Sequence, residues 1–163
     1  MKLYIQQKVF SLGDRFYVKG EDGIDKYRVE GEILSWGKKL HVYNRDEREI
    51  AFIEQEVLTL LPKYRVYVNG AEVAEIVKEF TFLFPKYRID GLGWEIDGDF
   101  MAHDYQIMQG GYPIASIRKE WFTWGDCYEV DITNPENEIV ALAVTLAIDC
   151  VLAQASSNAA MNS

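Results

Sequence analysis

The sequence has few of the residues that build metal sites and disulfide frameworks, since its 163 residues include only two histidines and two cysteines. Cys127 and Cys150 follow no spacing typical of a zinc site or a disulfide framework. Both are therefore interpreted as reduced, buried residues of a cytoplasmic protein. Residues 1–8 alternate polar and apolar side chains and lack the continuous apolar core of a signal peptide. No metal and no cofactor is expected.

Positive charge is also scarce, because 17 Lys and Arg residues stand against 26 Asp and Glu residues, for a net charge of −9. Nucleic-acid binding needs a basic patch, so nucleic acid is excluded as a partner. The sequence contains no nucleophile elbow, no phosphate-binding glycine loop and no His-Glu-x-x-His motif. No catalytic residue is assigned, and an enzyme of unknown class is the weakest interpretation.

Most of the chain alternates apolar and polar residues in short stretches rich in Val, Ile, Tyr and Phe, which is typical of half-buried strands. Gly, Asn and Asp separate the stretches, and pairs such as Asn69-Gly70, Asp97-Gly98 and Gly110-Gly111 suit tight hairpins. The pattern predicts an antiparallel meander that closes into a barrel, because closure removes exposed sheet edges. The expected strands are 3–10, 15–19, 27–34, 39–43, 49–55, 64–68, 72–79, 87–90, 94–97, 99–108, 112–120 and 127–132.

A different pattern begins after Asn134 and Pro135, which suit a helix start. Residues 139–148 are apolar on every side of a helix, so a helix of about 136–153 must be buried or lie in a membrane. The run is shorter than the roughly 20 residues that span a bilayer, and Asp149 interrupts it. No transmembrane segment is expected.

We therefore predict that this helix fills the barrel, with Leu142, Leu146 and Val151 almost fully out of water. Asp149 must then reach a partner or the barrel mouth, because an unpaired buried carboxylate is costly. Residues 1–153 are expected to form one barrel domain, and residues 154–163 a disordered polar tail.

Several motifs appear in a characteristic order. They are Ser35-Trp36-Gly37-Lys38-Lys39-Leu40, Pro-Lys-Tyr-Arg at 62–65 and again at 85–88, Gly91-Leu92-Gly93-Trp94, Gly98-Asp99-Phe100 with His103-Asp104-Tyr105, Trp121-Phe122-Thr123-Trp124-Gly125-Asp126, and the apolar terminal helix. In this order they resemble the LURP-one-related family, and within it the small bacterial YxjI-like members. The resemblance runs from about Met1 to Leu152.

The LURP-one-related family is placed in the tubby-like C-terminal superfamily, beside the tubby domain and the phospholipid scramblases. The resemblance implies a closed barrel of about twelve antiparallel strands around a central hydrophobic C-terminal helix. Tubby domains bind phosphoinositide head groups and scramblases act on phospholipids, which makes phospholipid binding an expectation. No position of this chain matches the lipid-binding motif of tubby residue by residue, so no residue role is carried over.

Two groups of residues invite a chemical interpretation but favour a structural one. Asp97, Asp99, His103 and Asp104 could bind a metal or act as acid and base. However, Asp97-Gly98-Asp99 is typical of a turn, and His103 and Asp104 would point to opposite faces of the strand 99–108. His41 is interpreted as a half-buried structural histidine on its strand.

The aromatic side chains could stack on a sugar or a base. The four tryptophans, however, stand where aromatics pack a barrel, so they are expected in the core. They are Trp36, Trp94, Trp121 and Trp124.

The candidate binding site is a basic cluster of Lys63, Arg65, Lys86 and Arg88. Lys63 and Arg65 share one face of a strand, as do Lys86 and Arg88, and one strand should separate the two pairs. The four cations would lie about 10 Å apart across the sheet and suit a phosphate group. Alternatively, they belong to an outer face neutralised by Glu79 and Asp90.

The sequence thus favours a non-catalytic binding or scaffold domain for phospholipid head groups or another phosphate-bearing ligand. The alternative is a structural or regulatory protein that acts through protein partners. The acidic remainder of the chain would weaken attraction to an anionic membrane beyond about one Debye length.

Overall fold

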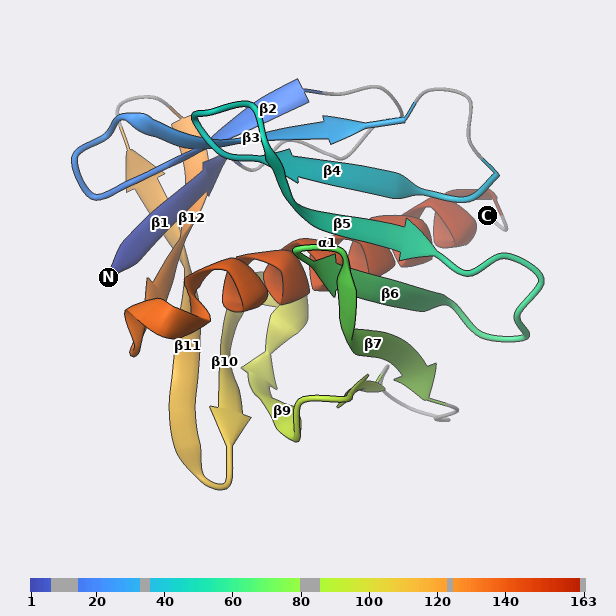
Figure 1. The fold of residues 1–163 in the computed structure, drawn as a ribbon. Helices are drawn as coiled ribbons and strands as arrows, with labels where there is room; N and C mark the ends of the chain where they lie inside the picture. Colours follow the sequence, from blue (N-terminus) through green and yellow to red (C-terminus); the bar gives the residue numbers. More distant parts are fainter. Residues whose placement is uncertain (7–14, 33–35, 80–85, 123–124, 162–163) are drawn as a thin grey trace.

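The computed structural model describes residues 1–6, 15–32, 36–79, 86–122 and 125–161. They form twelve strands, two short 3-10 turns and one long helix (Figure 1). In chain order the elements are β1 (Lys2–Gln6), β2 (Arg15–Lys19), β3 (Asp25–Gly31), β4 (Lys39–Tyr43), β5 (Glu49–Gln55), β6 (Lys63–Val68), β7 (Ala71–Glu79), β8 (Lys86–Asp90), β9 (Trp94–Asp99), η1 (Phe100–Ala102), β10 (Asp104–Gln109), β11 (Tyr112–Phe122), β12 (Gly125–Ile132), η2 (Pro135–Asn137) and α1 (Glu138–Met161).

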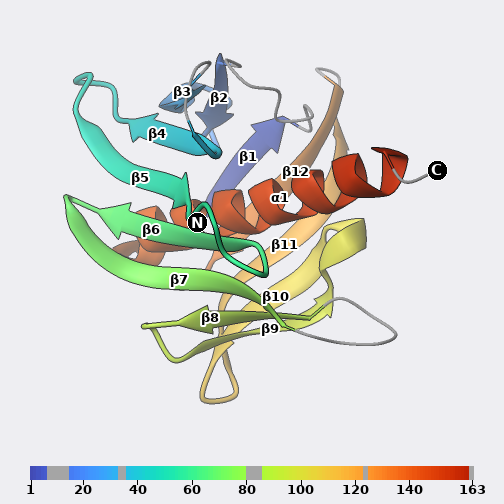
Figure 2. The same ribbon diagram turned by 90° about the vertical axis from the view of Figure 1, so that its right-hand side faces the viewer.

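The strands form one antiparallel sheet that curls into a nearly closed barrel. Its order is β8-β7-β6-β5-β4-β3-β2-β1-β12-β11-β10-β9, so the first strand pairs with the last, and Leu3 lies opposite Val130. Strands β8 and β9 lie side by side at the seam (Figure 2), where no ladder joins their described residues. The predicted meander and barrel are confirmed.

The barrel interior is apolar because alternate residues of each strand point inward. Strand β1, for example, buries Leu3 and Ile5 completely, while its remaining residues are only partly buried. Ladder hydrogen bonds satisfy the backbone of each paired strand, so the wall presents to the interior mainly side chains. Other strands contribute inward residues that include Val18, Val29, Val42, Ile53, Val66, Ile76, Ile107, Ile117 and Val130.

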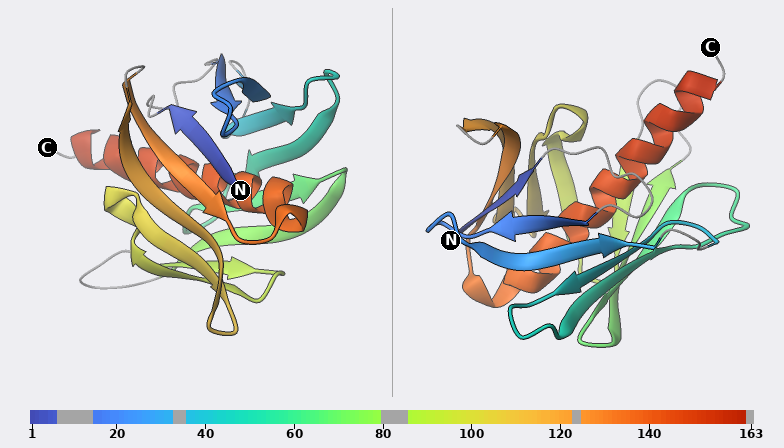
Figure 3. Two further views of the ribbon diagram at one scale, coloured as in Figure 1. Left: turned by 90° about the vertical axis from the view of Figure 1, so that its left-hand side faces the viewer. Right: turned by 90° about the horizontal axis from the view of Figure 1, so that it is seen from above.

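Helix α1 passes through this interior and leaves it at the far end (Figures 1 and 3). Leu142 and Leu146 are 0% exposed and Val151 is 2% exposed, which confirms the central-helix prediction. Ala141, Ala143 and Ala147 are buried as well. The helix starts near the predicted signal: the side chain of Asn134 accepts a hydrogen bond from the backbone N–H of Glu136, ahead of α1 in η2.

The helix continues to Met161, beyond the expected end near residue 153. Residues 154–161 are mostly Ala, Ser, Asn and Gln, with no Gly or Pro to end the helix. Within the described chain, no helix combines the length and the hydropathy that crossing a membrane would require. The ends of two expected strands, residues 7–10 and 33–34, lie outside the described residues.

The region around Gly98 differs from the prediction. Asp97-Gly98 is not a hairpin turn, because β9 runs through both residues to Asp99, and η1 then makes the turn before β10. Gly98 has φ +110°, and a Cβ added there would lie 2.8 Å from the carbonyl oxygen of Asp104. The glycine is therefore needed for close approach of β10 rather than for a hairpin.

Replacing Leu146 by Asp should prevent folding, because it places a charge in the middle of the only core of the described chain. We expect a loss above about 4 kcal/mol in the free energy of unfolding. Circular dichroism and urea unfolding measure the effect. The matched control is Leu58→Asp, since Leu58 is exposed and should lose almost nothing. A cooperative transition of wild-type midpoint in Leu146→Asp would contradict the central helix.

Gly98→Ala should destabilise the protein by about 1 to 3 kcal/mol more than Gly23→Ala, because only a Cβ at position 98 would collide with backbone atoms of β10. Both glycines have positive φ, but a Cβ at Gly23 has nothing within 4 Å. Urea unfolding of the two variants separates steric contact from backbone strain. Equal losses would show that the approach of β10 does not require glycine.

Candidate functional site

The four predicted basic residues lie together on the outer wall of the barrel. Lys63 and Arg65 come from β6, and Lys86 and Arg88 from β8, with β7 hydrogen-bonded between them. Lys63 and Arg88 both pair with Val77 of β7, so they flank the same point of the wall. The predicted strand order, with one strand between the two pairs, is therefore confirmed.

The cations of β6 lie beside carboxylates. The Nζ of Lys63 is 2.9 Å from a Glu75 oxygen and 3.3 Å from a Glu56 oxygen. Arg65 lies 3.1 Å from Glu56 and 3.5 Å from Glu75. The hydrogen bond from Lys63 helps to hold the pKa of Glu56 below its ordinary value. This part of the wall is thus electrically balanced.

The cations of β8 are more exposed. Arg88 donates two hydrogen bonds to Asp90, at 2.5 and 2.9 Å, and lies 3.4 Å from Glu79. Those bonds lower the pKa of Asp90. Lys86 is exposed and has no ion pair among the described residues. The anion-binding role of this basic face, Lys63, Arg65, Lys86 and Arg88, stays a prediction.

A buried polar cluster that the sequence did not reveal connects the helix to the wall. The Nε2 of His103 is 3.2 Å from Oδ1 of Asp149, and the Tyr128 hydroxyl donates to Oδ2 of the same carboxylate. The rings of His103 and Tyr128 lie 4.8 Å apart. Burial raises the pKa of Asp149, and the hydrogen bond from His103 opposes that rise. Asp149 therefore has the partners that its burial demands.

The position of His103 explains why the cluster was missed. His103 follows η1 rather than lying within a strand, and its left-handed backbone, with φ +53°, accompanies a ring that reaches Asp149. Asp97, Asp99 and Asp104 are exposed, and Asp99 accepts from the N–H of Ala102. Among the described residues, no three His, Cys, Asp or Glu side chains are arranged to hold a metal. The sequence feature that could have indicated the cluster was Asp149, the one charge within the apolar run.

His41 lies half-buried on the outer wall, as predicted. Its Nδ1 is 2.6 Å from Glu49 and its Nε2 is 2.9 Å from Glu32. Burial lowers the pKa of His41, but the hydrogen bonds to Glu49 and Glu32 outweigh burial, so the pKa is raised. From β4 the imidazole thus links Glu32, which follows β3, to Glu49 of β5, which is a structural role.

The tryptophans only partly follow the expectation that they pack the core. Trp94 is buried, but Trp36 is 84% exposed, so that prediction is wrong for Trp36. The residue precedes β4 in a loop at the rim of the barrel, where no sheet face covers it. Trp124 lies outside the described residues, and the side chain of Trp121 is not described.

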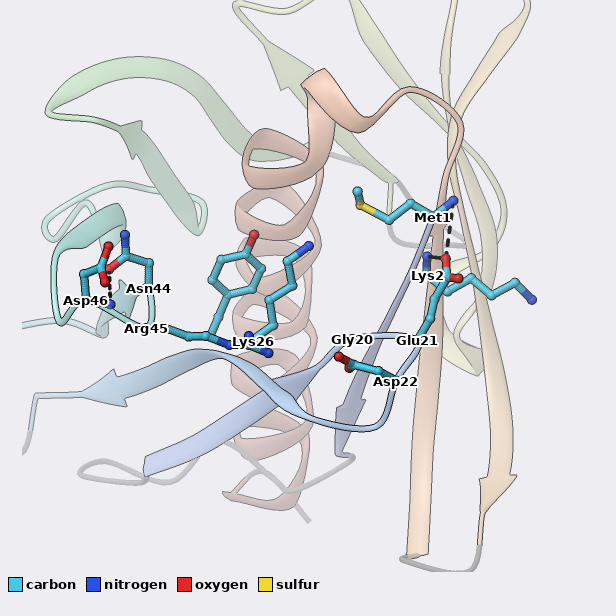
Figure 4. A pocket seen from close by; sticks show the side chains of 10 residues that line it. Met1, Lys2, Gly20, Glu21, Asp22, Lys26, Asn44, Arg45 and Asp46 are labelled. Carbon is cyan, nitrogen blue, oxygen red and sulfur yellow. Dashed lines mark hydrogen bonds and ion pairs between the residues drawn. The ribbon is translucent and has the colours of Figure 1, made fainter.

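A hollow of about 550 Å³ opens at the barrel end where α1 begins (Figure 4). Charges of both signs line it, and several already have partners. The Met1 ammonium lies 3.8 Å from Glu21, and Lys26 lies 2.6 Å from Glu138. The Tyr27 hydroxyl donates to Glu138 at 2.7 Å. The hollow therefore does not favour an ion of either sign.

Asp149→Asn should change how stability depends on pH. Burial raises the pKa of Asp149 in the folded state. The contribution of this residue to the free energy of unfolding is therefore fully present below the pKa of an unfolded Asp, about 3.9, and is lost as pH rises through the pKa of the folded state. Relative to wild type, the Asn variant should therefore gain stability as pH rises from about 4. Urea unfolding at successive pH values measures this difference. The control is Asp104→Asn, at an exposed position. If the stability difference between Asp149→Asn and wild type stays constant with pH, the raised pKa of Asp149 is contradicted.

The comparisons with known proteins agree with this architecture. The family model described as LURP-one-related matches residues 1–149. The chain is 35% identical over 152 residues to "Uncharacterized protein YxjI" of Bacillus subtilis strain 168, covering 93% of this chain and 94% of that protein. An X-ray structure of an Arabidopsis thaliana protein has the same fold, with a TM-score of 0.61 at 9% identity, over 91% of this chain and 89% of that one. The chain therefore belongs to the LURP-one-related family.

Proposed function

We propose that this chain is a non-catalytic, cytoplasmic binding domain for a phosphate-bearing ligand, either a phospholipid head group or a soluble phosphate. The basic face, Lys63, Arg65, Lys86 and Arg88, is the proposed contact surface. The observation that carries the proposal is that four cations project from one outer face of three adjacent strands. The name of the Bacillus subtilis relative states no activity, so the proposal rests on residues of this chain.

The packed interior supports binding on the outside of the barrel. Helix residues from Ala141 to Val151 are buried among the inward side chains of the strands. The His103–Asp149 pair is held within this packing by Tyr128, where its carboxylate serves the fold. These features favour a rigid platform over a catalytic cavity.

The carboxylates on the basic face set the strength of binding rather than prevent it. Exposed ion pairs contribute only about 0 to 1 kcal/mol, because water screens the charges and the two side chains lose conformational freedom when the pair forms. A phosphate dianion can therefore replace Glu79 or Asp90 as the partner of Arg88 at little cost, and it accepts two parallel hydrogen bonds from a guanidinium. Binding should be modest and should weaken as salt rises.

Charge reversal of the more exposed half of the face tests the proposal. The double variant Lys86→Glu with Arg88→Glu should lose about tenfold or more in affinity, since each charged contact contributes about 1.5 to 3 kcal/mol. The control is Arg15→Glu with Lys19→Glu, two cations of β2 that also have carboxylate partners. Sedimentation with vesicles and calorimetry with inorganic pyrophosphate are the measurements, and circular dichroism checks the fold.

The two probes distinguish the sources of phosphate. Binding to vesicles of phosphatidylcholine and phosphatidylglycerol without binding of pyrophosphate indicates a lipid head group, and binding of pyrophosphate indicates a soluble ligand. Equal binding by the variant and wild type would remove the basic face from the site. Absence of binding to either probe would favour the alternative of a protein partner.

A further inference from the structure

Among the residues that the structure describes, the three most exposed large apolar side chains lie at one end of the barrel. Leu58 is 97% exposed, Leu60 is 90% exposed and Trp36 is 84% exposed. They lie in the connections between β3 and β4 and between β5 and β6, at the end where α1 leaves the barrel (Figure 1). Met101, in η1, is exposed at the same end. We call Trp36, Leu58, Leu60 and Met101 the apolar mouth.

Specific contacts hold two of these loops together. The backbone N–H of Gln55 donates to the carbonyl of Lys38 at 2.7 Å, and the N–H of Lys38 donates to the Gln55 side chain at 3.1 Å. A Cβ added at Gly37 would lie 2.7 Å from a methyl carbon of Val57, so the two loops touch. The loops therefore present their apolar side chains as one supported unit.

The backbone of Leu58 points to a purpose for its exposure. Leu58 has φ +63°, a left-handed conformation that is costly for a residue with a branched side chain. Folding holds the residue in this conformation and leaves its side chain in water, where it contributes no packing. Strained, exposed apolar residues of this kind are more typical of a contact surface than of a structural loop.

The barrel end that carries the apolar mouth is less acidic than the opposite end. Lysines stand at the ends of the strands around the apolar mouth: Lys38, Lys39, Lys63, Lys78 and Lys86. Carboxylates at the same end offset this charge: Glu32 lies 3.6 Å from Lys39 and Glu56 lies 3.3 Å from Lys63. The strand ends there also carry Glu79, Asp99 and Asp104.

The acidic excess of the chain lies toward the opposite end of the barrel. Its turns and strand ends carry Glu21, Asp22, Asp46, Glu47, Glu72 and Glu95. Lys26 and Arg45 offset part of that charge. An anionic surface would therefore repel this end more strongly than the end that carries the apolar mouth.

We propose that the apolar mouth inserts into the interface of an anionic phospholipid bilayer. Side chains exposed by more than four-fifths protrude rather than line a groove, and a fluid bilayer accepts protruding side chains without a matching shape. Tryptophan is enriched at the membrane–water interface, and leucine gains from burial among acyl chains. The inference rests on the proposed function for the phospholipid ligand, and it adds the membrane itself as the partner.

The geometry also connects the two surfaces. Lys63 and Lys86 are the first residues of β6 and β8, so they stand at the same end of the barrel as the apolar mouth. With Leu58 and Leu60 inserted, these two lysines lie at the depth of the head groups. Arg65 and Arg88 lie about 7 Å further up the wall, at two residues of strand rise.

Leu58→Ser with Leu60→Ser tests the insertion. The variant should bind vesicles of phosphatidylcholine and phosphatidylglycerol at least about tenfold more weakly, because burial of each leucine contributes about 1.5 to 3 kcal/mol. The matched control is Ile24→Ser with Tyr112→Ser, two exposed apolar residues at the opposite end of the barrel. The melting temperature should stay unchanged in both variants, since none of the four side chains is buried.

The outcomes test the apolar mouth and the basic face separately. Loss of vesicle binding in the leucine variant alone supports insertion, even where charge reversal of the basic face has no effect. Vesicle binding equal to wild type in the leucine variant overturns insertion, while binding of pyrophosphate would leave the proposed function standing. A concentration-dependent dimer in light scattering, lost in the leucine variant, would overturn the bilayer in favour of a second copy of the chain.

Discussion

Burial of a helix that is apolar on every side is the constraint on which the rest of this structure depends. An amphipathic helix can lie on a sheet, but α1 has no polar face between Ala141 and Ile148, so a single sheet would leave part of it in water. A barrel surrounds such a helix, and the helix in turn fills an interior too wide for the strand side chains alone. The two elements therefore stabilise each other, and neither forms a complete core without its partner.

The same constraint makes Asp149 the critical polar residue of the interior. A carboxylate on a buried helix destabilises the fold unless it is hydrogen-bonded. His103 and Tyr128 supply those bonds from two different parts of the wall. The close approach at Gly98, near the end of β9, and the left-handed backbone of His103, just before β10, lie in one short stretch of the chain. The strained backbone of this stretch thus accompanies the hydrogen bond that His103 makes with the buried carboxylate of Asp149.

The sequence predicts the repeating strands and the apolar helix of this molecule well, but it predicts poorly the turns, loops and polar contacts that depend on distant parts of the chain. Alternation identified the strands that the structure describes, and the uniform apolar pattern identified α1, because burial acts on each residue directly. The turn predicted at Asp97-Gly98 was wrong because an Asp-Gly pair suits a hairpin, while its glycine equally suits a close approach of strands, and only the partner strand distinguishes the two. Trp36 was wrong because composition indicates burial on average, whereas its loop has no neighbouring face to cover it. The pairing of His103 with Asp149 depends on three-dimensional proximity across 46 residues of sequence.

The direction of the chain gives the two ends of the barrel different roles. At the end where α1 begins, short turns such as Asn69-Gly70 and Gly110-Gly111 join the strands and leave little room for variation. At the end where α1 leaves, the connection from Glu56 to Pro62 and the segment that contains Trp36 are longer. Longer loops on a rigid scaffold can change without disturbing the core, so surfaces for partners arise there. The filled core needs short connections at only one end of the barrel. The longer loops at the other end can therefore expose Leu58 and Trp36 without weakening the packed interior.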